Sequence, residues 1–109
     1  MSAQDMIKSA VDGNDVMLFM KGTPIFPQCG FSSKVAQVLD YLGVEYGSMN
    51  VLENDDVRQG IKDFSNWPTI PQLYVKGDFV GGCDIIMEMF ETGELKPYLK
   101  EMGVLTEDA

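Results

Sequence analysis

Cysteine is the residue type in this chain best suited to covalent chemistry, and the sequence has two, Cys29 and Cys83. In the run Cys29-Gly-Phe-Ser32, serine stands where a Cys-X-X-Cys motif has its second cysteine, which excludes a dithiol switch within this loop. A helix start and the nearby Lys21 lower the pKa of a thiol. We therefore expect Cys29 to be a thiolate, while the alternative is a small, buried hydrophobic residue.

Other kinds of site are limited by composition. The chain has no histidine, which excludes Ser-His and Cys-His catalytic pairs and imidazole metal ligands. Two cysteines are too few for a disulfide scaffold or a four-ligand zinc site. The net charge of −9 argues against nucleic acids and anionic membranes as partners. Sulfur chemistry at Cys29 therefore depends on thiols from outside the chain.

Basic residues gather around the first cysteine. Residues 16–39 hold two lysines, Lys21 and Lys34, and no acidic residue. Arg58 and Lys62 are four positions apart on an expected helix and so share one face. One interpretation is an ordinary solvated face. The other is a clamp for the carboxylate of a small anionic ligand.

Two further motifs lie directly before an expected strand and an expected helix. Trp67-Pro-Thr-Ile-Pro71 indicates a rigid loop, and its Ile70–Pro71 bond is a candidate for the cis form. Gly81-Gly-Cys-Asp84 marks a junction between a strand and a helix, where glycines let a ligand approach the backbone and free N–H groups favour a carboxylate. The alternatives are that Asp84 is only an N-cap and that Cys83 is a buried structural cysteine.

The first half of the chain predicts two helices and two strands. A capping box over Ser2 to Asp5 starts a helix that ends at Gly13, and residues 16–20 form a strand buried on both faces. Apolar spacing predicts a second helix between Cys29 and Gly43, followed by a strand over residues 44–51. The inward positions of the first helix are expected to be Met6, Ile7 and Ala10.

The second half predicts a helix, a hairpin and two more helices. Asn54 caps a helix over about residues 55–64, with Val57, Ile61 and Phe64 inward. Strands at residues 72–75 and 79–80 flank the turn Lys76-Gly-Asp78 and should be antiparallel. Helices follow from near Asp84 to Gly93 and from about residue 94 to 102, and we expect the acidic tail from about residue 103 to fray.

These elements assemble into a four-stranded mixed sheet with helices on both faces, an α/β fold. The length of 109 residues fits one domain over residues 1–109, with a core at about 16–102. The longest apolar run, residues 16–20, is far shorter than the roughly 18 residues of a membrane span. With no targeting signal recognisable, we expect a cytoplasmic protein. Cys29 lies at the carboxyl end of the first strand, where such sheets form sites.

Four motifs in this order and spacing resemble the single-domain monothiol glutaredoxins of the thioredoxin superfamily: Lys21-Gly-Thr-Pro24, Cys29-Gly-Phe-Ser32, Trp67-Pro-Thr-Ile-Pro71 and Gly81-Gly-Cys-Asp84. The resemblance covers about residues 16–102. It implies a thioredoxin-like fold that binds glutathione. It also implies a monomer that becomes a glutathione-bridged homodimer when it holds a [2Fe-2S] cluster, which it delivers to apo-proteins together with cluster assembly factors.

The same resemblance implies a role for each candidate residue. Cys29 would be the catalytic thiol and the cluster ligand. Lys21 and Arg58, with Lys62 as a weaker candidate, would hold a glutathione carboxylate. The backbone of Ile70 would pair with the cysteinyl unit of glutathione, and Cys83 and Asp84 would receive its γ-glutamyl end. A [2Fe-2S] centre commonly takes four thiolates, which two Cys29 side chains and two glutathione thiols supply.

Alternatives remain open from the sequence. The leading interpretation is a cluster carrier, a binding protein more than an enzyme, and the second is a glutathione-dependent thiol oxidoreductase that uses Cys29 alone. A redox-sensing module based on a Cys29–Cys83 disulfide ranks third. Ile25 and Phe26 make the loop before Cys29 more apolar than an exposed loop usually is, which suggests a partner surface or an altered dimer.

Overall fold

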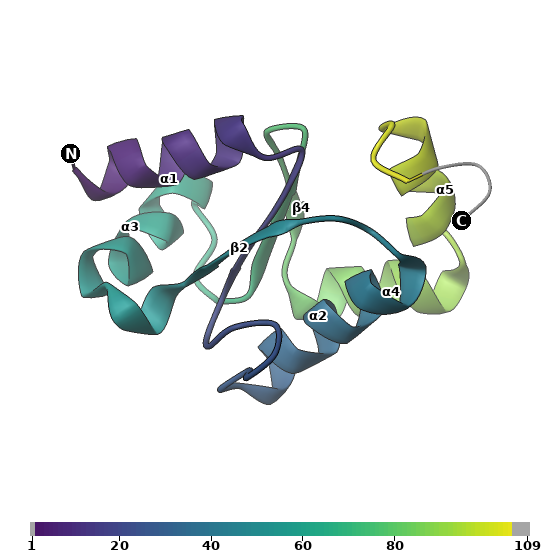
Figure 1. Cartoon of the computed structure of the whole chain (residues 1–109), viewed down its shortest axis with the longest axis horizontal. Helices are drawn as coiled ribbons and strands as arrows, with labels where there is room; N and C mark the ends of the chain where they lie inside the picture. The colour runs from purple at the N-terminus through teal and green to yellow at the C-terminus, as the bar shows by residue number, and fades with distance from the viewer. Residues whose placement is uncertain (1, 106–109) are drawn as a thin grey trace.

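A sheet of four strands in the order β2-β1-β3-β4 forms the centre of the computed structural model, which describes residues 2–105 (Figure 1). Strand β1 (Val16–Met20) pairs in parallel with β2 (Gly47–Asn50) and antiparallel with β3 (Gln72–Val75). Strand β4 (Asp78–Gly81) pairs antiparallel with β3, as the hairpin motif predicts. The expected mixed sheet is confirmed.

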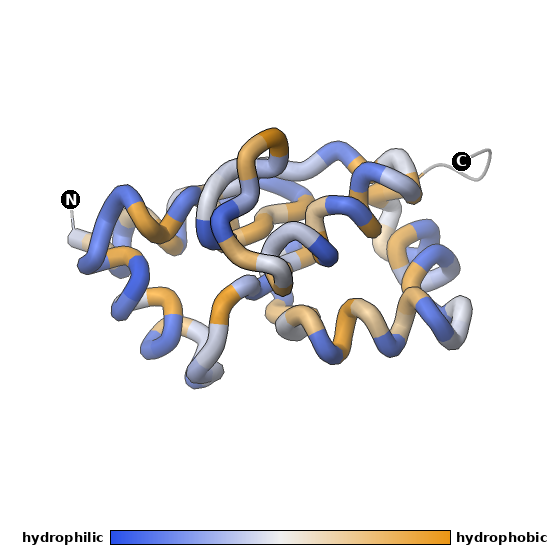
Figure 2. Tube along the Cα trace, turned by 90° about the horizontal axis from the view of Figure 1, so that it is seen from below, coloured by the Kyte–Doolittle hydropathy of each residue, from blue (hydrophilic) through white to orange (hydrophobic). Residues whose placement is uncertain are grey.

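Helices cover both faces of this sheet (Figure 1). One face carries α1 (Ala3–Gly13) and α3 (Asp55–Ser65), with a short 3-10 helix, η1 (Val51–Glu53), leading into α3. The other face carries α2 (Gly30–Leu42), α4 (Cys83–Thr92) and α5 (Leu95–Glu101). Along their turns the helices alternate between hydrophobic and hydrophilic stretches (Figure 2). None of the helices within residues 2–105 is long and apolar enough to span a membrane.

Strand β1 divides its side chains between the two layers. Val16, Leu18 and Met20 pack with α2, α4 and α5, whereas Met17 and Phe19 pack with α1 and α3. All five side chains are buried. The strand therefore lacks polar alternation because both of its faces are interior. This central, fully packed strand holds the loop that starts at its carboxyl end.

Several predicted helix ends are confirmed. The Ser2 hydroxyl accepts the Asp5 N–H at 3.1 Å, and the Asp5 carboxylate accepts the Ser2 N–H, which completes the capping box. The Asn54 side chain accepts the Val57 N–H at the start of α3. Gly43 ends α2 in the left-handed region, at a φ of 78°.

Other predicted details of α1, α3 and β2 are incomplete or wrong. In α1 the predicted inward residues do pack on the core, with Ile7 fully buried and Met6 and Ala10 partly buried, but Val11 is a second buried position that was not predicted. In α3 Phe64 is 36% exposed, because Gly60 is the third buried position and lets α1 pack closely. Strand β2 begins only at residue 47, and residue 51 already belongs to η1, since the chain turns there toward α3.

The start of α4 and the residues that follow α5 also differ from expectation. Gly82, and not Asp84, is the N-cap of α4, which begins at Cys83. Residues 103–105 do not fray: Leu105 is buried, and the Val104 N–H donates to the Leu99 carbonyl at 3.1 Å. Apolar residues at these positions extend the core beyond α5. The rest of the expected tail, residues 106–109, lies outside the described residues.

Candidate functional site

Cys29 is the N-cap of α2 and follows a closed loop that leaves the carboxyl end of β1. The Gln28 N–H donates to the Lys21 carbonyl at 2.9 Å, and Gly22 forms a bridge with Pro27. At Gly22 the φ is 93°, and an added Cβ would lie 2.5 Å from the Gln28 nitrogen. Only glycine fits this turn, which returns the chain to Lys21 and places the thiol beside it.

Backbone hydrogen bonding and charge lower the pKa of the Cys29 thiol. The largest cause is the Ser32 N–H, opposed by partial burial and reinforced by the Phe31 N–H, by the Lys21 charge and by the Ser32 hydroxyl. At Cys83 burial acts first and Asp84 second, and the pKa of this thiol is raised. Cys29 is therefore the thiol with more thiolate at neutral pH, as the sequence predicts.

Ser32 has a positioning role that sequence reasoning missed. From the sequence, Ser32 indicates only that a resolving cysteine is absent, yet its side chain is fully buried, and its hydroxyl oxygen accepts the Lys21 N–H at 3.0 Å. The same hydroxyl contributes to the lowered pKa of Cys29. It therefore links the thiol loop to the first turn of α2. The signal available in the sequence for this role was a hydroxyl side chain three residues after a cysteine that starts a helix.

A cavity of about 310 Å³ opens beside Cys29. We call it the thiol cavity; its lining consists of Lys21, Cys29, Phe31, Arg58, Lys62, Pro68, Thr69 and Ile70. Three of these residues are cations and none is acidic. Within residues 2–105 these three cations form no ion pair. Five of the seven predicted site residues thus meet around one space that favours an anion.

The other two predicted residues line an adjoining cavity of about 280 Å³. We call it the side cavity; its lining consists of Phe31, Trp67, Thr69, Ile70, Pro71, Gly82, Cys83, Asp84 and Ile85. Phe31, Thr69 and Ile70 belong to both linings. The two cavities therefore adjoin along these three residues, with cations at one end and the first turn of α4 at the other.

The loop between α3 and β3 forms the wall that the two cavities share. Its Ile70–Pro71 bond is cis, the form for which the sequence made it a candidate. The buried Gln72 amide donates to the Trp67 carbonyl at 3.2 Å and to the Thr69 carbonyl at 3.1 Å, and its Oε1 accepts the Tyr74 hydroxyl. Gln72 fixes the loop, and sequence reasoning missed it. The signal available in the sequence for this role was a polar residue at the start of a strand expected to be buried.

Metal-binding capacity within one chain is small. Among residues 2–105, no group of three or more histidine, cysteine, aspartate or glutamate residues is arranged to hold a metal ion. Both cysteines are free thiols. The only soft ligand with thiolate character is Cys29, so any iron–sulfur cluster held here needs thiolates from other molecules.

Comparisons with known sequences agree with this geometry. The family model described as Glutaredoxin matches residues 16–80. The chain is similar to monothiol glutaredoxin-S17 of Arabidopsis thaliana, with 56% identity over 92% of the chain but only 20% of the relative. It is also similar to the monothiol glutaredoxin ycf64-like protein of Synechocystis, with 53% identity over 86% of the chain and 88% of the relative. The chain spans about a fifth of the first relative and most of the second.

Two solved structures have the same fold. A monomeric truncated mutant of Trypanosoma brucei 1-C-Grx1 matches with a TM-score of 0.87 and 43% identity, over 100% of this chain and 98% of the other. A buckwheat glutaredoxin–glutathione complex matches with a TM-score of 0.82 and 27% identity, over 95% and 93% of the two chains. The expected thioredoxin-like fold is therefore confirmed.

Proposed function

The chain belongs to the glutaredoxin family, in its monothiol branch, and from this we propose that it binds glutathione and carries a [2Fe-2S] cluster to apo-proteins. In this proposal the cluster is cargo, held in a glutathione-bridged homodimer. The observation that carries it is the single activated thiol, Cys29, beside three cations that have no ion-pair partner within residues 2–105.

Glutathione matches the two cavities in chemistry. Its glycyl carboxylate would meet Lys21 and Arg58, with Lys62 at the edge, through charge-assisted hydrogen bonds. Its cysteinyl unit would lie along the backbone of Ile70, next to Cys29. The γ-glutamyl end would reach the first turn of α4, at Cys83 and Asp84. The buckwheat relative, solved as a glutathione complex, supports glutathione as the ligand.

The number of thiolates favours a dimer. A [2Fe-2S] cluster commonly takes four thiolates, whereas one chain offers one activated thiol. Two Cys29 side chains and two glutathione thiols complete the set. Glutathione bound next to Cys29 would then position half of the ligands. Apo iron–sulfur proteins and cluster assembly factors are the partners that this function requires, in a compartment such as the cytosol where Cys29 and Cys83 stay reduced.

The second candidate is glutathione-dependent reduction of protein–glutathione mixed disulfides, which the lowered pKa of Cys29 favours. The Cys29 thiolate would attack the glutathione sulfur, and the protein would leave as a thiolate. A second glutathione thiolate would then attack the Cys29–glutathione disulfide. This step would release Cys29 and glutathione disulfide. One protomer suffices for both steps.

Oligomeric state separates the two candidates. We expect the apo-protein to be a monomer, because its charge of −9 is self-repelling, and the protein reconstituted anaerobically with iron, sulfide and glutathione to be a dimer. Light scattering and visible absorbance measure both states. A cluster retained by a monomer would contradict the carrier model. Rapid turnover of a glutathionylated substrate by a monomer that binds no cluster would favour the oxidoreductase.

A further inference from the structure

Two hollows lie on the helical layer of α2, α4 and α5, and neither shares a lining residue with the thiol cavity. The first, of about 390 Å³, is lined by Lys34, Gln37, Val38, Tyr41, Met87 and Phe90. The second, of about 450 Å³, is lined by Leu42, Phe90, Gly93, Lys96, Pro97 and Lys100. Phe90 belongs to both, so we treat them together and call them the helix groove.

An aromatic pair stands where the two hollows meet. The rings of Tyr41 and Phe90 pack edge to face, with centroids 5.8 Å apart and planes at 85°. Tyr41 is 80% exposed, although its ring is one of the largest apolar surfaces on α2. Exposed tyrosines beside hydrophobic hollows are typical centres of protein interfaces. Phe90 therefore separates the two hollows, and Tyr41 packs against it on the side of the first hollow.

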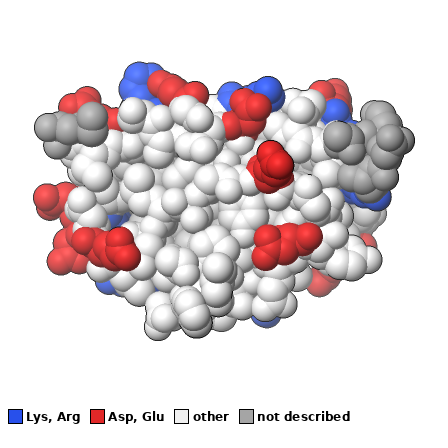
Figure 3. Space-filling model, viewed as in Figure 1, with Lys and Arg blue, Asp and Glu red and all other residues white. Residues whose placement is uncertain are grey.

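Charge distinguishes the helix groove, like the thiol cavity, from most of the acidic chain. The chain has 17 acidic and 8 basic residues, and acidic side chains predominate on the face that Figure 3 shows. Yet Lys34, Lys96 and Lys100 line the groove and no acidic residue does. Lys34 and Lys96 are exposed and form no ion pair within residues 2–105. The groove is thus apolar at its floor and basic at its rim.

The helix groove also has a direction. Helix α2 begins after Cys29 and α4 begins at Cys83, and the two helices run side by side toward α5 (Figure 1). The charge of Lys34 acts on Cys83, so the near end of the groove lies close to the side cavity. A molecule lying in the groove would therefore point one end toward the thiol site.

We propose that the helix groove binds an acidic amphipathic helix of a partner protein. One apolar side chain of that helix would enter each hollow, on either side of Phe90, and carboxylates would face Lys34 and Lys96. A symmetric pairing of two copies through this surface is disfavoured, because it would set lysines against lysines. The inference does not depend on glutathione or cluster binding.

The probe is an 18-residue amidated peptide with leucines at alternating three- and four-residue spacing and glutamates elsewhere. The matched control replaces every glutamate with lysine. Each is titrated into the full ¹⁵N-labelled chain. We expect the acidic peptide to shift amide signals of residues 34–42 and 87–100, and the basic peptide to leave them unchanged. The proposal is overturned by equal binding of both peptides, by no binding at millimolar peptide, or by shifts confined to the thiol cavity or residues 25–26.

Substitutions of the lysines at the rim of the helix groove test whether peptide binding depends on their charge. Lys34→Glu combined with Lys96→Glu should weaken acidic-peptide binding at least tenfold, because two attractive charges become repulsive. Lys8→Glu combined with Lys76→Glu changes the net charge equally on residues that do not line the groove, and should change binding less than threefold. Equal effects of the two pairs would show a non-specific charge effect and overturn the site. Signals at the groove that shift with protein concentration alone would instead identify a second copy as the occupant.

Discussion

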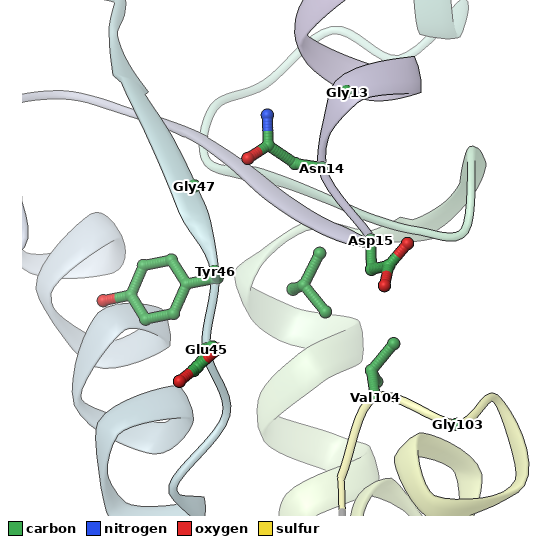
Figure 4. Close-up of a pocket in the computed structure, with 9 residues that line it drawn as sticks. Gly13, Asn14, Asp15, Glu45, Tyr46, Gly47, Gly103 and Val104 are labelled. Atoms are coloured by element: carbon green, nitrogen blue, oxygen red, sulfur yellow. The ribbon is translucent and has the colours of Figure 1, made fainter.

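The two ends of the sheet both carry cavities, and the larger one is not at the activated thiol. The end opposite Cys29 has a cavity of about 550 Å³, against about 310 Å³ for the thiol cavity. Figure 4 shows it between the end of α1, the segment that enters β2 and the turn after α5. Asp15, Glu45 and Tyr46 are among its lining residues. Size alone therefore does not indicate where chemistry is possible.

What separates the two ends is the kind of charge that lacks an ion-pair partner: within residues 2–105 the far cavity has one such acidic residue, Glu45, and the thiol cavity has cations. At the far end Asp15 pairs with Lys76 at 3.4 Å, and the Asn14 amide donates to the Ala10 carbonyl at 2.8 Å. Burial, together with Asp40, raises the pKa of Tyr46 to about 12, so its phenol stays protonated. At the thiol cavity three cations have no ion-pair partner within residues 2–105, and the nearby thiol has a lowered pKa. Unpaired positive charge beside an activated nucleophile marks the thiol cavity as the site.

Removing the nucleophile should have the largest effect. Cys29→Ser should abolish cluster binding and leave the fold intact, because it replaces the only activated thiolate with little change in volume. Visible absorbance after anaerobic reconstitution, with circular dichroism for the fold, measures both. Cys83→Ser is the matched control and should retain the cluster, because its thiol has a raised pKa. Undiminished sulfur-to-iron absorbance in Cys29→Ser would show that another residue binds the cluster.

Removing one cation of the thiol cavity should have the next largest effect. Arg58→Ala should weaken glutathione binding about tenfold or more, since a charge-assisted hydrogen bond contributes about 1.5 to 3 kcal/mol. Isothermal titration calorimetry with glutathione measures this. Lys8→Ala makes the same charge change on α1 and should leave the affinity unchanged. Equal affinities in the two variants would make Arg58 an ordinary surface charge.

Ser32→Ala tests how the thiol is activated. Losing the hydroxyl should raise the pKa of Cys29, which should still stay below its ordinary value because the Ser32 and Phe31 N–H groups remain. In a Cys83→Ser background, the pH midpoint for alkylation by iodoacetamide should move upward. Ser33→Ala removes a neighbouring hydroxyl that accepts the Gln37 amide and should leave the midpoint unchanged. A midpoint that does not move in Ser32→Ala would assign the activation to backbone and charge alone.

The same variant should show pH-dependent stability. The Lys21 N–H loses its buried acceptor, which costs about 1 to 3 kcal/mol at any pH. A lowered thiol pKa stabilises the fold above the pKa of the unfolded chain, and this contribution is lost as pH falls through the folded pKa. Ser32→Ala should therefore destabilise the protein more above the unfolded thiol pKa than at acidic pH. Urea unfolding at the two pH values measures the difference.

The sequence predicted what depends on local patterns. An unbroken apolar run identified β1 and apolar spacing identified α2. The motifs identified five of the seven residues that the structure gathers around two adjoining cavities, and helical spacing added Arg58 and Lys62. It did not identify Ser32 or Gln72, because their roles depend on hydrogen bonds to a loop carbonyl or amide that only the fold brings near. It also placed Phe64 inward, since helical spacing cannot show that Gly60 takes that position against α1.

The smallest effect is expected where the far cavity is changed. Asp15→Asn removes the carboxylate from an exposed ion pair with Lys76, which contributes less than about 1 kcal/mol. Because this cavity lies at the other end of β1, glutathione affinity and the alkylation midpoint of Cys29 should both stay at their original values. Calorimetry and the alkylation profile, run beside Arg58→Ala, measure this. A loss of glutathione affinity comparable to that of Arg58→Ala would mean that the two ends of the sheet are coupled, and that partnered charges at the larger cavity also contribute to the site.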